Sequence, residues 1–358
     1  MSTIVRSDTS LPEYPWLPPV LRRLWRAPGV LQIGTDSARA VVLHNATEEI
    51  AALIASLDGR RHLSTVLDQC PVNESTARDV LATLACEGLL VDLADAADGP
   101  PDPADHPSLS GALAPELHGR ALGSLSVSPA EILRLRARAH VVIVGGPRLA
   151  AAVGALLAAS GVRQFGLVQR GSVCGADLLP GGLLATDLGR DRHGAIGDAI
   201  SRSAPGTTVT ALGTTDRPSI VLLADPVDPA SERARMLMAT RTPLLVMSIR
   251  ERRGVIGPLV VPGESSCLEC QDAVRRDLDR HWGVLKPQLL NHPGSAGEGG
   301  ETALVMMTAA LAATQVLQWI DGERLPETLN ASLEIALPDL VLERRYWPRH
   351  AACACRIR

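Results

Sequence analysis

The chain has 358 residues, enough for two or three domains, and 46% of them are hydrophobic, which is ample for packed cores. A formal net charge of −4 excludes a protein that binds nucleic acid through an overall basic field, and the 2% aromatic content disfavours a base-stacking surface. Lysine occurs once, at Lys286, so no other lysine is available to clamp a phosphate group.

The first residues, MSTIVRSDTSLPEYPW, contain no apolar signal core. The longest uncharged apolar stretch, 302–320, has the length of a membrane span. It contains Thr308, Thr314 and Gln315, and we interpret it as a buried helix. We therefore expect a cytoplasmic protein without a membrane partner.

Residues 1–93 form the first predicted domain. Two strands are expected at 30–33 and 40–43, followed by three short helices, the third of which begins at Ser75. This order is the outline of a winged helix-turn-helix domain, for which DNA binding is the usual function. The third helix, however, offers only Arg78 among three acidic residues, so the sequence favours a partner other than nucleic acid.

The same domain resembles the PqqD-like peptide-recognition domains, through the segments LHNATEEIAALIASLDGRRHLSTVLDQC and ARDVLATLACEGLL. In that family a leader peptide adds as a strand beside the hairpin and lies against the third helix. Main-chain hydrogen bonds then supply affinity, and side-chain pockets supply selectivity. The resemblance implies an edge strand and a groove helix, about 75–87, that contact the peptide through Ala40, Val41, Val42, Leu43, Arg78 and Leu81.

An acidic, proline-rich segment follows, and residues 94–124 are predicted to be a linker. From residue 125 to residue 358, strand and helix patterns alternate, which indicates an α/β domain with a doubly wound, Rossmann-like sheet. Its entry unit is the apolar strand 140–144, the turn Gly145–Gly146 and a helix that ends near Ser160.

The turn departs from the usual phosphate-binding fingerprint. Pro147, Arg148 and Ala150 stand where a working loop has glycines, and Gln169 and Arg170 stand where an acidic residue would bind ribose. Proline lacks a backbone donor, and an arginine side chain is bulky where the backbone must approach a pyrophosphate. The sequence favours a scaffold without nucleotide, while Arg148 and Arg170 leave phosphate binding open.

Four of the seven cysteines form two close pairs, Cys267 with Cys270 and Cys353 with Cys355. In a chain without a secretion signal, such pairs indicate metal rather than disulfides, and four thiolates suit a closed tetrahedral zinc site. We expect a structural zinc ion that fastens the C-terminus to the main body. Two buried thiol pairs or a redox couple are the alternatives, and Cys174 is a minor candidate for a nucleophile.

Residues 125–358 as a whole resemble the ThiF-type adenylating fold shared with the ubiquitin-activating enzymes. The segments VVIVGG, LVQRGSV and VLLADPVD, the CLEC pair and the terminal cysteine pair carry this resemblance. It implies a nucleotide site at Gly145, Gly146, Arg148, Arg192 and Asp228, with Asp228 as the magnesium-linked residue if the protein is active. Arg192 stands where the family has lysine and the family's arginine is absent, so we expect ATP and magnesium to bind weakly or not at all.

A peptide-recognition domain ahead of a degenerate ThiF-like domain resembles the leader-binding partner subunit of azoline-forming cyclodehydratases. That resemblance implies a homodimeric, non-catalytic adaptor that binds a precursor peptide and presents it to a YcaO-type or other modifying enzyme. The alternative is an ATP-dependent adenylyltransferase that activates the C-terminus of a small protein or peptide. The glycine-rich loop 291–301 is expected to be mobile.

Overall fold

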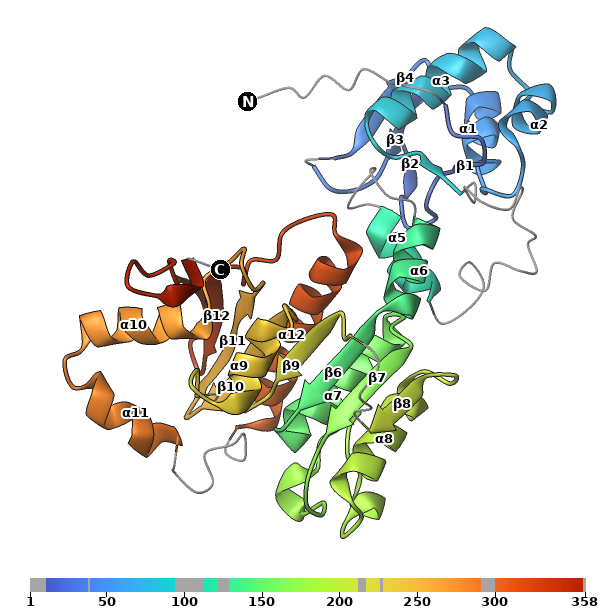
Figure 1. The fold of residues 1–358 in the computed structure, drawn as a ribbon. Helices are drawn as coiled ribbons and strands as arrows, with labels where there is room; N and C mark the ends of the chain where they lie inside the picture. Colours follow the sequence, from blue (N-terminus) through green and yellow to red (C-terminus); the bar gives the residue numbers. More distant parts are fainter. Residues whose placement is uncertain are drawn as a thin grey trace. The chain divides into compact units, whose positions relative to one another are not determined.

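The computed structural model describes residues 11–37, 39–93, 113–121, 129–211, 217–225, 228–290 and 300–356. The chain divides into two compact units, residues 1–133 and 134–358 (Figure 1). Most of the predicted linker 94–124, and the predicted mobile loop up to residue 299, lie outside the described residues. The described part of the linker segment forms a helix, α5 (Ala114–Ala121).

The first unit contains a three-stranded antiparallel sheet in the order β2-β3-β4. The sequence predicted β3 (Val30–Ile33) and β4 (Val41–His44) to within a residue, but it missed β2 (Arg23–Ala27). All five residues of β2 are exposed, so the strand carries no alternation of apolar and polar residues that would reveal it. A further short pair joins β1 (Pro15–Trp16) to β5 (Val91–Asp92).

Three helices follow the sheet of the first unit, as predicted: α1 (Glu48–Ala55), α2 (Leu63–Asp68) and α3 (Glu74–Cys86). Side-chain oxygens of Thr47 and Asn73 accept hydrogen bonds from backbone N–H groups in the first turns of α1 and α3, which satisfies donors that the helix cannot. One hydrophobic core joins the sheet to these helices, and it includes Leu31, Ile33, Val41, Leu53, Leu81 and Leu84.

The second unit is built on an eight-stranded sheet in the order β13-β12-β11-β10-β9-β6-β7-β8 (Figure 1). Five strands are parallel: β6 (His140–Val144), β7 (Gln164–Val168), β8 (Thr208–Ala211), β9 (Ile220–Leu223) and β10 (Leu244–Arg250). Three antiparallel strands extend the sheet: β11 (Arg253–Val260), β12 (Ala331–Ala336) and β13 (Val341–Tyr346). The predicted α/β doubly wound fold is confirmed.

The helices of the second unit begin with α6 (Pro129–Arg138), which crosses the boundary between the units, and α7 (Pro147–Ala159). They continue with α8 (Arg192–Ser203), α9 (Glu232–Ala239), α10 (Leu268–Leu278), α11 (Trp282–Leu290) and α12 (Thr302–Asp321). Single helical turns lie at Gly175–Asp177, Ala185–Asp187 and Ala354–Arg356.

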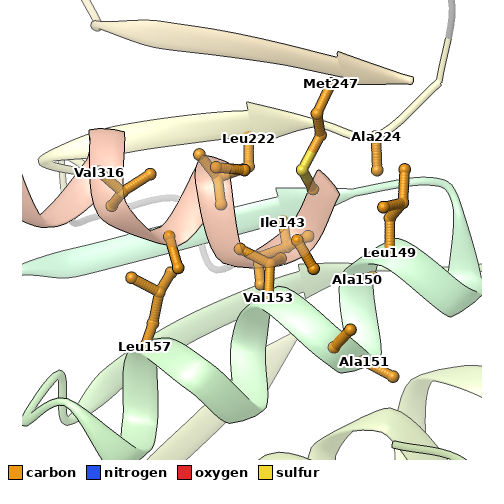
Figure 2. Close-up of a cluster of buried hydrophobic side chains, with 14 of the residues drawn as sticks. Ile143, Leu149, Ala150, Ala151, Val153, Leu157, Leu222, Ala224, Met247 and Val316 are labelled. Carbon is orange, nitrogen blue, oxygen red and sulfur yellow. The ribbon is translucent and has the colours of Figure 1, made fainter. Parts of the chain in front are cut away.

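The apolar helix α12 is long enough to cross a membrane, yet it belongs to the core of the second unit. It packs against α7 and lies over β10 and β11. Val153 and Leu157 of α7 lie beside Val316 of α12 in this core (Figure 2). The prediction of a buried helix is therefore confirmed.

The order of the parallel strands places a topological switch between β6 and β9. The chain runs from β6 outward to β7 and β8, and then returns to β9 and β10 on the other side of β6. Ligands of open α/β sheets bind where the connections diverge, at the carboxyl ends of such strands. Here that position is occupied by Gly145 and Gly146, which follow β6, and by Asp225 and Asp228, which follow β9.

Candidate functional site

Gly145 and Gly146 form a tight turn between β6 and α7, with φ angles of 73° and 47°. The N–H of Gly145 donates to the carbonyl of Val168 at 3.2 Å, and the N–H of Gly146 donates to Oδ1 of Asp225 at 3.0 Å. Pro147 has no N–H at all. Three consecutive positions of the turn therefore offer no free backbone donor to a phosphate.

Asp225 lies directly against this turn. A Cβ atom added at Gly145 would collide with the carboxylate of Asp225, and the positive φ of Gly145 further disfavours a side chain there. Burial raises the pKa of the Asp225 carboxyl, while the hydrogen bond from Gly146 and the charge of Arg233 oppose that rise. In its ionised form the carboxylate would repel a phosphate group at the turn.

Arg148 is buried, and its guanidinium joins the start of α7 to the start of α12. Nη1 donates to the carbonyl of Gly300 at 2.6 Å, and Nη2 donates to Oγ1 of Thr302 at 3.3 Å. Nε has no hydrogen-bond partner among the described residues. The side chain proposed from the sequence as a phosphate ligand is thus engaged within the protein.

Arg192, which stands where the family has lysine, is also engaged. Its Nε and Nη2 donate to the two carboxylate oxygens of Asp177, at 2.9 and 3.2 Å, and Asp177 is buried. Oδ2 of Asp177 also accepts from the N–H of Cys174. Gln169 stands where the family has an acidic residue, and its amide donates to the carbonyl of Gly145 at 3.0 Å.

Asp228, the candidate magnesium ligand, is ion-paired with the only lysine of the chain. Oδ1 of Asp228 lies 3.0 Å from Nζ of Lys286, which also lies 3.3 Å from Oδ1 of Asp272. Partial burial would raise the pKa of Asp228, but the N–H of Ala230 and the charge of Lys286 outweigh burial and lower it. Lys286 lines a cavity of about 500 Å³ beside α10 and α11, together with Asp272.

The sequence reasoning missed the partners Asp177, Asp225 and Lys286. Lys286 lies on α11, far along the chain from Asp228, and no local motif connects the two residues. The only signal was its uniqueness as a lysine. Of the residues proposed from the sequence, Gly145 and Gly146 form the turn, and internal partners engage the charged residues Arg148, Arg192 and Asp228.

The four paired cysteines converge at a second location in this unit. Cys267 caps α10, Cys270 lies in its first turn, and the C-terminal segment brings Cys353 and Cys355 beside them. All four sulfur atoms lie within 4.8 Å of one another, and all four residues are buried. Sulfur separations of 3.7, 3.5 and 3.3 Å exclude disulfide bonds, which have lengths of about 2.05 Å.

This donor set fits a zinc ion. Zn–S bonds of about 2.3 Å in a tetrahedron place sulfurs about 3.8 Å apart, close to the separations observed. Burial raises the pKa of Cys267, and it raises the pKa of Cys355 to about 11. Burial also acts on Cys270, but hydrogen bonds from the backbone of His350 and Cys267 lower its pKa overall. The four-cysteine cluster is thus consistent with the structural zinc expected from the sequence.

The candidate peptide site lies in the first unit. Among the described residues, β4 pairs only with β3, so one edge of β4 is open. Val41 is buried in the core, whereas Ala40, Val42 and Leu43 are half-buried. The register pairs Leu31 with Leu43 and Gln32 with Val42, so the strand presents alternate side chains to the core and to the outer face.

The two residues proposed on α3 have different environments. Arg78 is exposed, and its guanidinium bonds Glu74 one turn earlier at 2.7 Å. Leu81 is completely buried, so the structure assigns it to the core of the first unit rather than to an exposed groove, because its helix face packs inward. Cys174, the minor nucleophile candidate, is exposed and lies 3.9 Å from Nη2 of Arg192.

The chain matches no protein-family model and no curated protein. Solved structures do match over nearly the whole chain. The Escherichia coli protein MccB with ATP has a TM-score of 0.66 and 17% identity, covering 95% of this chain and 99% of the other. The microcin C7 biosynthetic enzyme MccB in complex with N-formylated MccA has a TM-score of 0.68 and 16% identity, covering 96% and 99%.

PaaA is also similar, with a TM-score of 0.64 and 14% identity, covering 92% of this chain and 98% of the other. At these identities the likeness establishes the fold. The chain has a Rossmann-like ThiF fold of the MccB type, with a small N-terminal unit and a C-terminal four-cysteine cluster. The expected resemblance to ThiF-type proteins is confirmed at this level.

Proposed function

We propose that the protein binds a ribosomally made precursor peptide by strand addition at β4 and delivers it to a modifying enzyme. The observation that carries the proposal is the open edge of β4, beside which the described structure places no further strand. An extended peptide placed there gains main-chain hydrogen bonds, and the half-buried Val42 and Leu43 offer apolar contacts for alternate side chains.

The matched structures support the peptide-binding part of this proposal. MccB has been captured with MccA and with N-formylated MccA, and both complexes align with this chain over 96% of its length. The same fold in this protein therefore has a precedent for holding a peptide. Peptide binding is common to the adaptor and to the adenylating alternative.

Adenylation is the second candidate, and the comparisons favour it, because the matched structures include MccB with ATP. The contacts within this chain favour the adaptor instead. The N–H groups of Gly145 and Gly146 already donate hydrogen bonds within the protein. The guanidiniums of Arg148 and Arg192 also donate to groups of the same chain, and Lys286 forms an ion pair with Asp228. Arg170 stays exposed, but with Arg148 and Arg192 engaged the described residues offer little of the preorganised charge that stabilises a phosphoryl transition state.

Peptide binding is tested by calorimetry with synthetic peptides that cover the precursors encoded beside the gene. Val42→Glu places a charge on the open edge and should weaken binding about tenfold, or about 1.4 kcal/mol. Leu24→Glu is the matched control, because Leu24 lies on β2 at the opposite edge and is 41% exposed. No saturable binding by the folded wild type, or equal loss in both variants, would contradict strand addition at β4.

Adenylation is tested separately by pyrophosphate exchange with ATP, magnesium and the bound peptide. The adaptor predicts no exchange above the level of Asp228→Asn. Exchange that depends on Asp228 would establish the enzyme and overturn the adaptor. Structural zinc, a cytoplasmic location, homodimer formation and a YcaO-type partner remain predictions alongside this proposal.

A further inference from the structure

Two arginines lie over the rings of two tryptophans in the second unit, and a third arginine interacts electrostatically with one of them. The guanidinium of Arg275 on α10 lies 5.1 Å from the ring centre of Trp282 and 5.1 Å from that of Trp347. The guanidinium of Arg345 on β13 lies 4.8 Å from the ring centre of Trp347. Arg250, at the end of β10, interacts electrostatically with Arg275. We call Arg250, Arg275 and Arg345 the arginine cluster.

The contacts with the tryptophan rings hold the guanidiniums of Arg275 and Arg345 in place. Trp347 is buried, and its Nε1–H donates to Oγ of Ser332 at 3.0 Å, so its ring cannot rotate freely. Trp282 is held in the same way, because its Nε1–H donates to Oδ1 of Asp272 at 2.8 Å. An arginine stacked on fixed aromatic rings keeps its N–H groups in a defined plane.

None of the three guanidiniums has a hydrogen bond or an ion pair with any residue that the structure describes. The neighbouring arginines differ in this respect. Arg253 pairs with Glu334 and Glu343, and Arg276, next to Arg275 on α10, pairs with Asp272. Among the described residues the cluster is therefore a group of positive charges without a direct hydrogen bond or ion pair, although Glu334 attracts Arg250 and Arg275 electrostatically.

The nearest acidic groups are engaged elsewhere. Glu334 accepts from Arg253 and from the hydroxyl of Ser332, and Asp272 accepts from Trp282 and pairs with Lys286. Burial and the charges of Arg250 and Arg345 lower the pKa of Arg275 to about 10, against the opposing effect of Asp272 and Glu334. The positive charges thus repel one another in the absence of a ligand.

We propose that Arg250, Arg275 and Arg345 form a binding site for an oxyanion, either a carboxylate or a phosphate group. Guanidinium groups donate pairs of hydrogen bonds to both kinds of ligand, and an anion relieves the repulsion among the three charges. The site lies on residues outside the nucleotide turn and the β4 edge. It stands independently of the proposed function.

The test titrates inorganic phosphate and an acetylated tetraglutamate peptide into the full-length, zinc-loaded protein. Binding is followed by calorimetry and by tryptophan emission, because Trp282 and Trp347 are two of the five tryptophans. Arg275→Gln, Arg250→Gln and Arg345→Gln should each weaken binding about tenfold or more, as expected for charged hydrogen bonds. Arg276→Gln is the control, since it removes one charge from the adjacent, already paired position.

Arg250 and Arg345 are exposed, so their variants should fold even if loss of the stacked Arg275 destabilises the protein. Peptide binding at least tenfold tighter than phosphate binding would assign the site to acidic polypeptide segments. Phosphate binding of equal or greater strength would assign it to free or nucleotide-borne phosphate. The proposal is overturned by the lack of saturable binding of either probe, or by equal weakening in Arg276→Gln and the cluster variants.

Discussion

Two regions of the second unit, the four-cysteine cluster and the turn after β6, each gather chemically active side chains from distant points of the chain. In the cysteine cluster the four sulfur atoms lie within 4.8 Å of one another, and three of the pairs are separated by 3.3 to 3.7 Å. At the turn, Arg148, Arg192 and Asp228 each face an oppositely charged or polar group of the same chain.

The difference shows that residue type and position do not suffice to identify a ligand site. Thiols bond weakly to other protein groups, so four of them brought together remain available to a metal ion. Guanidinium, ammonium and carboxylate groups bind one another readily, and a buried charge without a ligand must acquire an internal partner. At the turn the charged side chains are therefore engaged by internal partners, whereas the thiols of the cysteine cluster are not held by ion pairs.

The largest expected effect comes from the cysteine cluster. Cys270→Ser removes one of four thiolates, so bound zinc should fall from about one ion per chain to well below that value. Because structural zinc contributes folding free energy directly, the second unit should lose several kcal/mol of stability. Zinc analysis and thermal unfolding measure both quantities. Cys174→Ser, at an exposed cysteine outside the cluster, should change neither, and equal stability of the two variants would refute the metal site.

A smaller effect is expected at the partner of Arg192. Asp177→Ala leaves the guanidinium without its buried carboxylate and should destabilise the protein by about 3 kcal/mol in denaturant unfolding. Asp198→Ala, which removes a 58% exposed carboxylate from Arg190, should cost less than about 1 kcal/mol. If Asp177→Ala proved as stable as wild type, Arg192 would not be held by this pair and would be available for a phosphate.

The smallest expected effect concerns Asp228, whose side chain is 40% exposed. Lys286→Met removes the ammonium, so the pKa of Asp228 should rise toward its ordinary value, as followed by carboxyl carbon NMR during a pH titration. In the folded wild-type protein the pKa of Asp228 lies below its ordinary value. The stability from this pair is therefore complete above the unfolded pKa and is lost as pH falls through the folded pKa.

As the pH falls through the pKa of Asp228, the free energy of unfolding should therefore decrease less in Lys286→Met than in the wild type. Magnesium should also perturb the Asp228 signal in Lys286→Met if the ammonium occupies the place of a cation. An unchanged pKa in the variant would show that Lys286 does not hold Asp228 in solution.

Much of the architecture was predictable from local patterns. The strand at 140–144, the glycine turn and the buried helix at 302–320 follow from continuous apolar runs and glycine positions, and the cysteine spacing predicted the four-cysteine cluster. The strand β2 was missed because it is exposed on all residues, and Leu81 was placed in a groove although its helix face packs into the core. Both errors arise because burial depends on neighbours that the local pattern does not contain.

By itself, the sequence determined the buried strands and helices, the positions of the thiols along the chain and the glycine-loop residues that are replaced, because these follow from local propensity and residue type. Only the tertiary structure decided which charged groups meet their partners: Lys286 with Asp228, Asp177 with Arg192, and Arg275 and Arg345 with the ring of Trp347. Electrostatic partners are selected by proximity in space at a few ångströms, and the fold of the sheet and its helices sets that proximity.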